Sequence, residues 1–298
     1  HKNMMLESAA TSFQIHLQVN QKKGVDFYNA SKIASAPLVA IAANSPFLFE
    51  HELWEESRIP LFEQSISLAE KDYAERVTFG MRYLDDSLME YFDANRQRYV
   101  PLLPLLYKDK PEKLRHLCLH NGTIWRWTRV IIGDTKAKNP HLRIEQRVAS
   151  AGPTIEDCLA NSAFFYGLVT YLAYDKKKPE ENLDFYQARN NFYEAARLGL
   201  EASVTWENNK AYQLASLIEK KLLLQAKEGL KKLKVDPKVS QHFLGIIAER
   251  VRSKQTGSKW QREYKKKHNC SFEDLCNAYY KNQETAEPVH TWSLERAH

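Results

Sequence analysis

Alternation of apolar and polar residues predicts a strand near the start of the chain. Residues 13–19 alternate four apolar side chains with three polar ones, which is the period of a half-buried strand. Gln14 and His16 then lie on its polar side, because successive side chains of a strand point to opposite faces. The spacing therefore places both residues on a face outside the apolar core.

A second pair of strands is predicted further along the chain. Residues 123–132 are rich in β-branched and aromatic side chains, which favour extended backbone. Residues 142–148 alternate Leu142, Ile144, Gln146 and Val148 with Arg143, Glu145 and Arg147, so these three charges share one face. The loop 133–140 joins the two segments as an antiparallel pair.

Helical patterns dominate the second half of the chain. In the first half, residues 26–43 fit a buried helix that ends ahead of Pro46, because the residue before a proline is disfavoured in helical conformation. Thr154 is suited to cap the first helix of the second half. The tail after Ala286 is expected to be loosely held. The predicted helices of the second half span 154–174, 183–202, 209–232, 237–253, 258–267 and 271–283.

These elements predict an α+β protein with a mostly antiparallel sheet. Residues 1–152 form the sheet-containing part of the expected catalytic domain. Residues 153–298 form a helical part packed on that same domain. The 43% of hydrophobic residues in the 298-residue chain are enough to fill a core of this size.

Composition argues against a membrane protein or a secreted protein and bears on whether the chain binds nucleic acid. No apolar run reaches the length of a membrane span and no basic segment followed by an apolar one opens the chain, so we expect a cytoplasmic protein. The net charge is +6, with basic residues densest over 220–238 and 250–267. Such runs can bind nucleic acid. Acidic and apolar residues interrupt both runs at helical spacing, which favours a solvated helix face.

The sequence does not indicate a disulfide, a zinc site or either of two common nucleotide-binding motifs. The four cysteines form no Cys-x-x-Cys pair, so free thiols are expected. His116 and His120 could share one helix face as zinc ligands, but no second Cys or His pair accompanies them. The chain also lacks the glycine-rich phosphate loop and the dinucleotide-binding motif. An ATP site would therefore have to be built on the sheet.

The charged strand face has two interpretations. A carboxylate near an imidazole can coordinate Mg²⁺ or Mn²⁺, and an arginine two residues further along the strand can reach a phosphate. Glu145, Arg147 and His16 offer this combination. The alternative is an exposed sheet face on which Glu and Arg form a cross-strand ladder with a structural role.

The order of several segments resembles the glutamate-cysteine ligase family, in particular its plant-like and type 2 bacterial carboxylate-amine ligases. The resemblance runs from about residue 4 to residue 265. The segments that carry it are Met4-Met5 through Thr11–Leu17, Ile41–Phe47, Glu56-Ser57-Arg58, His120–Trp125 followed by Arg129, Leu142–Arg147 with Gly152-Pro153, Asn191–Leu200, and Thr256–Ser258 with Gln261-Arg262.

The resemblance implies a glutamine-synthetase-like sheet and ATP-dependent formation of a γ-glutamyl amide, with glutamate and an amine such as cysteine as substrates. It implies catalytic roles for Arg147, Arg58 and Arg197, which would hold phosphates or the substrate carboxylate. Gln14, His16 and Arg147 would bind ATP. Glu145 and His16 would hold Mg²⁺ or Mn²⁺. The expected partners are these small molecules, without nucleic acid or membrane, and the activity would serve glutathione biosynthesis.

One departure from the family pattern leaves an alternative function open. The family's opening strand, whose glutamates complete the metal site, would lie ahead of residue 1, so the sheet is expected to be incomplete in this chain. An N-terminal segment absent from this chain would then supply the missing part. The alternative is a catalytically inactive binding or regulatory module of the same fold.

Overall fold

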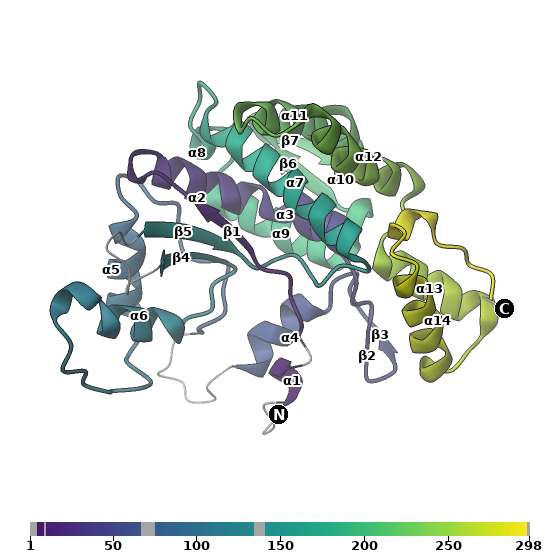
Figure 1. Cartoon of the computed structure of the whole chain (residues 1–298), viewed down its shortest axis with the longest axis horizontal. Coiled ribbons are helices and arrows are strands. Elements are labelled where there is room, and N and C mark those ends of the chain that lie inside the picture. Colours follow the sequence, from purple (N-terminus) through teal and green to yellow (C-terminus); the bar gives the residue numbers. More distant parts are fainter. Residues whose placement is uncertain (1–4, 9, 67–74, 134–140, 297–298) are drawn as a thin grey trace.

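A three-stranded antiparallel sheet lies at the centre of the computed structural model, with the strand order β1-β5-β4 (Figure 1). The structure describes residues 5–8, 10–66, 75–133 and 141–296. The strands are β1 (Ile15–Gln18), β4 (Thr128–Gly133) and β5 (His141–Gln146). The predicted antiparallel pairing of the last two is confirmed. Part of the predicted loop 133–140 lies outside the described residues.

The register of the sheet separates an apolar face from a charged one. Glu145 lies opposite His16 on one side and opposite Arg129 on the other. The neighbouring positions Ile144 and Val130 belong to the buried core. Because side chains alternate along each strand, the charged residues point away from that core.

Helices cover the apolar face of the sheet in two layers (Figure 1). One hydrophobic core runs from the strands through these helices, and so joins the first half of the chain to the second. Gly167 and Gly229 lie where α7 and α11 meet, and a Cβ atom on either would collide with the backbone of the other helix. The helices are α2 (Gly24–Ile33), α3 (Ser35–Ala42), α7 (Ile155–Ala173), α9 (Phe185–Leu198), α11 (Leu223–Lys232) and α12 (Pro237–Ser253).

Shorter helices lie on the other side of the sheet, below it in Figure 1. Of these, α4 begins with Arg58 and so brings that residue toward the end of β5. They are α1 (Met5–Ser8), α4 (Arg58–Ser65), α5 (Met89–Arg98) and α6 (Arg115–Gly122). The remaining short elements are β2 (Phe47–Leu48), β3 (His51–Glu52), α8 (Pro179–Asn182) and α10 (Leu214–Leu217).

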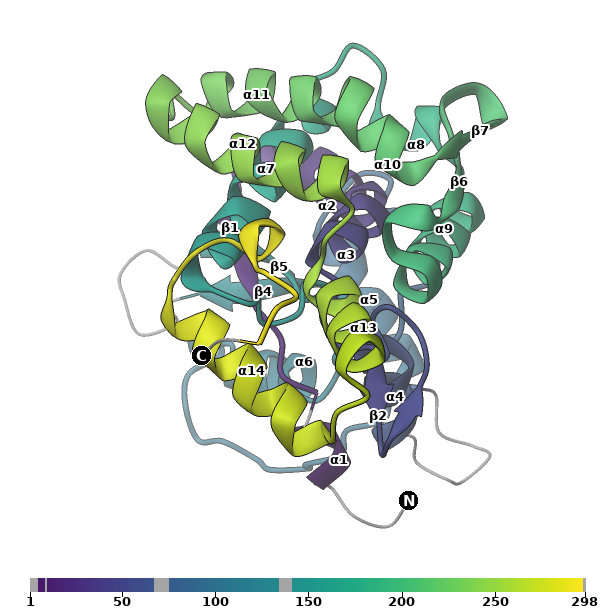
Figure 2. The ribbon, with the colours of Figure 1, turned by 90° about the vertical axis from the view of Figure 1, so that its right-hand side faces the viewer.

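The C-terminal helices α13 (Gly257–His268) and α14 (Phe272–Glu284) lie together at one end of the molecule (Figure 2). They have a small apolar cluster of their own around Trp260. The prediction of a loose tail after Ala286 is wrong for the described residues, because Val289 and Trp292 are buried in this region. Packing of these two side chains holds the tail against the helices.

The predicted helix boundaries are largely confirmed. Thr154 and Ser271 each accept a hydrogen bond from the third residue of the helix that they cap. Two predictions need correction. The helix expected over 26–43 is broken at Ala34 into α2 and α3. The strand expected over 123–132 begins only at Thr128.

A hairpin replaces helix at the start of one predicted helix. The prediction of helix over 183–202 and 209–232 is wrong at the start of the second span, where β7 (Lys210–Gln213) pairs with β6 (Ser203–Trp206). The turn between them contains Asn208 and Asn209, both with positive φ. Asparagine tolerates this conformation better than most residues, and its presence in tandem favours a tight hairpin.

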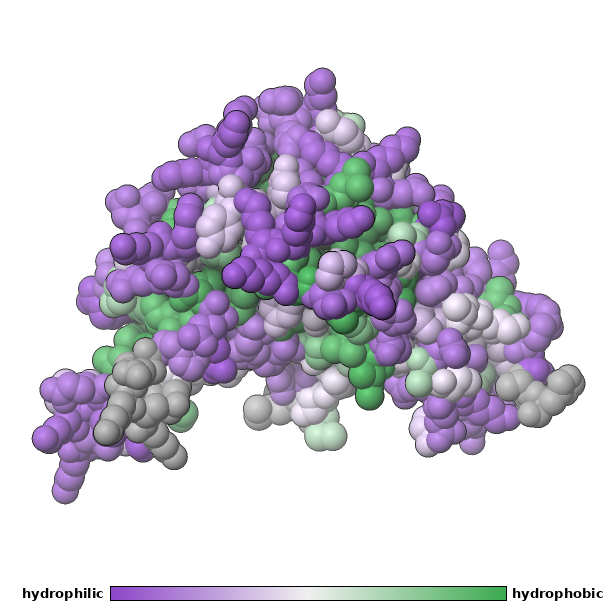
Figure 3. All heavy atoms as spheres, turned by 45° about the horizontal axis from the view of Figure 1, so that its top comes forward, coloured by the Kyte–Doolittle hydropathy of each residue, from purple (hydrophilic) through white to green (hydrophobic). Residues whose placement is uncertain are grey.

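The basic residues of α11 lie on a hydrophilic outer face. Lys227, Lys231 and Lys232 are exposed together with Glu228, whereas Ala226 is buried. Figure 3 shows how strongly hydrophilic side chains dominate the face of the molecule on this side. Among the described residues, no helix has the length and apolar character that crossing a membrane requires.

Candidate functional site

The carboxylate of Glu145 lies at the centre of the charged sheet face. Its Oε2 accepts a hydrogen bond of 2.8 Å from Nη1 of Arg129, and lies 3.8 Å from Nε of Arg147. Its Oε1 lies 3.5 Å from Nε2 of His16. Glu145 is 4% exposed, so the interpretation as an exposed cross-strand ladder is wrong, although Arg129 does pair with it across the strands. The structure thus brings His16, Glu145 and Arg147 together, as the alternation of the strands predicted.

Arg147 follows directly after β5 and is buried with part of its guanidinium unpaired. Its backbone N–H donates to the carbonyl oxygen of Trp127, which continues the pairing of β5 beyond the strand. Its Nε and Nη1 atoms are buried and have no hydrogen-bond partner among the described residues. Burial lowers the pKa of Arg147 to about 10, and the charges of Arg129 and Arg58 act in the same direction against Glu145. The guanidinium therefore stays charged at neutral pH, and an anion would satisfy its free nitrogens.

A cavity of about 260 Å³ lies against Arg147 on the open side of the sheet. Arg58 and Arg147 are the basic residues of its wall, and Glu7 is the acidic one. Polar side chains from the segment after α1, including Gln14, form much of the rest of the cavity wall. We call this space the arginine cavity; it is lined by Glu7, Ser8, Ala10, Thr11, Ser12, Gln14, Arg58, Phe62, Trp127 and Arg147. Its size suits a phosphate or carboxylate group, and its wall has an excess of positive charge.

Arg58 is held in place by a buried carboxylate. Glu56 is fully buried, and its Oε1 accepts from Nε of Arg58 at 3.0 Å. The backbone N–H of Asn44 donates to the other oxygen of Glu56 at 2.8 Å. The guanidinium of Arg58 also donates to the carbonyl oxygen of Val148. Burial lowers the pKa of Arg58, whereas the charge of Glu56 raises it. Arg58 therefore clamps α4 to the end of β5 and presents a fixed charge to the cavity.

His16 is a half-buried neutral base at neutral pH. Burial lowers its pKa, and Arg143, Arg129 and Arg147 lower it further, while Glu145 opposes them. Its backbone carbonyl accepts a hydrogen bond of 2.9 Å from the hydroxyl of Tyr166, which ties β1 to α7. The Nδ1 atom is buried without a hydrogen-bond partner among the described residues. A neutral imidazole can accept a hydrogen bond or bind a metal ion through such an atom.

The described residues do not complete a site for Mg²⁺. Six oxygen ligands are typical of this ion, and no group of three or more His, Cys, Asp or Glu side chains suited to a metal occurs in the described ranges. Arg129 already neutralises one oxygen of Glu145. Coordination of a metal ion by Glu145 and His16 stays a prediction.

Arg197 does not join the other predicted residues. It lies on the exposed surface of α9 and forms an ion pair of 2.8 Å with Glu194, one helical turn away. It is not part of the wall of the arginine cavity. Its assignment as a catalytic residue stays untested, and its position is that of a surface residue.

We expect the substitution Arg197→Gln to leave the activity that the sequence resemblance implies unchanged, because an exposed ion pair between residues of one helix contributes little. The free energy of unfolding should change by about 0.5 kcal/mol or less. Urea denaturation and steady-state kinetics check both expectations. A loss of about tenfold or more in kcat/KM would instead place Arg197 at the site.

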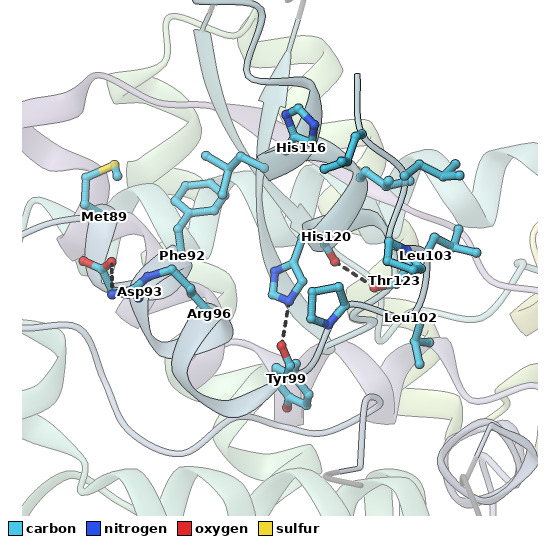
Figure 4. Close-up of a pocket in the computed structure, with 16 residues that line it drawn as sticks. Met89, Phe92, Asp93, Arg96, Tyr99, Leu102, Leu103, His116, His120 and Thr123 are labelled. Atoms are coloured by element: carbon cyan, nitrogen blue, oxygen red, sulfur yellow. Dashed lines mark hydrogen bonds and ion pairs between the residues drawn. The ribbon is translucent and has the colours of Figure 1, made fainter. Parts of the chain in front are cut away.

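A larger cavity, of about 610 Å³, lies elsewhere, between α5, α6 and the segment that joins them (Figure 4). Its wall is mostly apolar and contains none of the predicted site residues. His116 and His120 line it, but each is engaged with backbone: Nε2 of His116 accepts from the N–H of Tyr107, and Nε2 of His120 lies 2.8 Å from the carbonyl oxygen of Tyr99. Both imidazoles therefore already have a backbone partner.

Three residues at the site were not singled out from the sequence as functional. The β4 residue Arg129 pairs with Glu145, and the register of the hairpin was the signal that would have found it. Trp127 lies in the wall of the cavity, where its ring lies 5.3 Å from the guanidinium carbon of Arg58. Glu56 comes from a loop, and no sequence pattern indicates that its carboxylate is buried.

The fold and the site define an α+β protein that presents two fixed arginines to a small cavity suited to an anion. The family model described as Glutamate-cysteine ligase family 2 (GCS2) matches residues 1–281, and the chain belongs to this family. The resemblance seen in the sequence motifs is thereby confirmed, and family membership supports a ligase-like enzyme. A search of curated proteins gives no match.

Proposed function

We propose that the protein is an ATP-dependent carboxylate-amine ligase that joins the γ-carboxylate of glutamate to an amine, with cysteine as the leading candidate. Family membership supports the reaction class. The observation that carries the proposal is the buried guanidinium of Arg147, a residue that lines a small cavity with an excess of positive charge and whose Nη1 has no hydrogen-bond partner among the described residues. A relation of the small sheet to that of glutamine synthetase is part of this proposal.

The proposed reaction has two steps. An oxygen of the γ-carboxylate of glutamate attacks the γ-phosphorus of ATP, the bond to the β-phosphate oxygen breaks, and ADP leaves. The nitrogen of the amine then attacks the carbonyl carbon of the acyl phosphate, the carbon–oxygen bond breaks, and phosphate leaves as the nitrogen loses a proton. The protein supplies no nucleophile, so its contribution is to position the reactants and to balance phosphate charge.

Arg147 and Arg58 are suited to balance that charge. Their guanidinium groups are fixed by buried partners, so little reorganisation is needed when negative charge develops between them. Glu145 holds Arg147 and Arg129 on the same face, and Gln14 adds an amide at the cavity wall. The small volume of the cavity fits the transferred phosphoryl group or a substrate carboxylate; the nucleoside of ATP would extend beyond it. A divalent cation would accompany ATP.

Release of phosphate by the full-length protein tests the proposal. The protein is incubated with ATP, Mg²⁺, glutamate and a panel of amines that includes cysteine. We expect phosphate release that requires both glutamate and an amine, with a γ-glutamyl product detected by mass spectrometry. ATP binding measured by calorimetry without turnover of any combination would instead indicate a binding module. Absence of both binding and turnover would exclude either function.

A further inference from the structure

Polar side chains of the C-terminal helices α13 and α14 converge on Asn44, which lies just after α3. The side-chain amide of Asn44 donates from Nδ2 to the hydroxyl of Tyr279 in α14 at 2.8 Å, and its Oδ1 lies 3.1 Å from the same hydroxyl. Nε2 of Gln261 in α13 donates to Oδ1 of Asn44 at 3.0 Å and to its backbone carbonyl oxygen at 2.9 Å. A Cβ atom on Gly257 would lie 2.0 Å from Oδ1 of Asn44, so α13 also packs closely against this side chain.

The helix α13 also holds the chain on both sides of the loop from Asn44 to Glu56. Ahead of Asn44, the backbone N–H of Ser258 donates to the carbonyl oxygen of Ala43 at 2.9 Å. Ahead of Glu56, the carboxylate of Glu55 accepts from the hydroxyl of Ser258 at 2.6 Å. The two ends of the loop are therefore fixed to the same turn of α13.

A continuous series of hydrogen bonds leads from Asn44 to the arginine cavity. The backbone N–H of Asn44 and the hydroxyl of Ser45 each donate at 2.8 Å, to the two oxygens of Glu56 respectively. Oε1 of Glu56 also accepts from Nε of Arg58, which lines the cavity. Because Glu56 is fully buried, these partners determine where its carboxylate lies and hence where the guanidinium of Arg58 is held.

We propose that α13 and α14 belong to the apparatus of the proposed reaction, with Gln261 and Tyr279 as positioning residues that fix Asn44 and, through Glu56, Arg58. The inference rests on the proposed ligase function, to which it adds the part of the molecule that sets the geometry of the anion site. A charge held in place needs little reorganisation during reaction. A displacement of about 1 Å far from the chemistry can cost on the order of a hundredfold in rate.

The test is the substitution Tyr279→Phe in the full-length protein, which keeps the ring and removes the hydroxyl. We expect the KM for ATP or for glutamate, whichever places its anion at Arg58, to rise about threefold to tenfold, because one link that holds Asn44 is lost. A loss of folded protein alone would lower kcat and leave both KM values unchanged. Tyr280→Phe is the matched control, because the hydroxyl of this exposed neighbour donates to Glu284 within α14, and it should behave as wild type.

A double variant shows whether the effect passes through Arg58. In an Arg58→Lys background, Tyr279→Phe should cause no further change in KM, because the guanidinium that it positions is already absent. Unchanged KM values in Tyr279→Phe, or the same change with and without Arg58, would overturn the inference.

Failure of the inference is distinguishable from failure of the ligase proposal. Wild-type protein that releases no phosphate with any amine would overturn the ligase proposal and the inference with it, whereas active wild-type protein with an unaffected Tyr279→Phe variant would overturn the inference alone. If Tyr279→Phe fails to fold, Gln261→Met decides by the same KM values, because it keeps the length of the side chain and removes the amide that donates to Asn44.

Discussion

Replacing Arg147 with glutamine is expected to lower the kcat/KM of ligation by about a hundredfold or more. The reason is that Arg147 lines the arginine cavity and that Nη1 of its buried guanidinium has no hydrogen-bond partner among the described residues, so a substrate anion in the cavity would pair with this group. Glutamine removes the charge that would balance the transferred phosphoryl group. Steady-state kinetics with ATP, glutamate and cysteine measure the effect.

Two further variants make the result for Arg147 specific. Arg147→Lys keeps the charge but not the planar fork of donors, and should therefore retain an intermediate activity. Arg252→Gln, on the exposed surface of α12, removes a charge that does not line the cavity and should behave as wild type. Wild-type kinetics in a folded Arg147→Gln protein would show that this guanidinium does not contact a substrate.

Replacing Glu145 with glutamine is expected to destabilise the protein by about 3–5 kcal/mol. The carboxylate is the counter-charge for Arg129 and Arg147, which are 9% and 8% exposed. Without it, two buried guanidinium groups face each other on one sheet face, and desolvation of their charges is no longer offset. Urea denaturation followed by circular dichroism measures the change in the free energy of unfolding.

A double variant separates loss of this counter-charge from loss of packing. In Glu145→Met with Arg129→Met, one guanidinium and the carboxylate are removed together, so most of the stability should return. We expect the double variant to be more stable than Glu145→Gln. A cost below about 1 kcal/mol for Glu145→Gln alone would mean that this cluster is solvated and does not hold the site together.

The parts of the site that lie on one strand could be predicted from the sequence. Alternation fixed the shared face of Glu145 and Arg147, and also placed Gln14 and His16 on the polar side of their own strand. These inferences need only the two-residue period of extended backbone. The helix caps at Thr154 and Ser271 were equally local, because the capping side chain and its partner are three residues apart.

The parts that depend on contacts between distant segments could not be predicted. The hydrogen bond between Trp127 and Glu63 joins residues 64 positions apart, and nothing local distinguishes Glu63 from a surface glutamate on a short helix. The burial of Glu56 depends likewise on how its loop packs against Arg58. The exposure of Arg197 was likewise not predictable, since a helical motif shared with a family does not say which way a side chain points.

The fate of the γ-carboxylate oxygen distinguishes an acyl phosphate mechanism from any other route to the amide. Glutamate labelled with oxygen-18 in its γ-carboxylate is incubated with the full-length protein, ATP, Mg²⁺ and cysteine, and the released phosphate is examined by mass spectrometry. Attack of that carboxylate on the γ-phosphorus predicts one labelled oxygen in each phosphate released. Unlabelled phosphate accompanying γ-glutamyl product would contradict the acyl phosphate mechanism, and absence of product with every amine would contradict the ligase function.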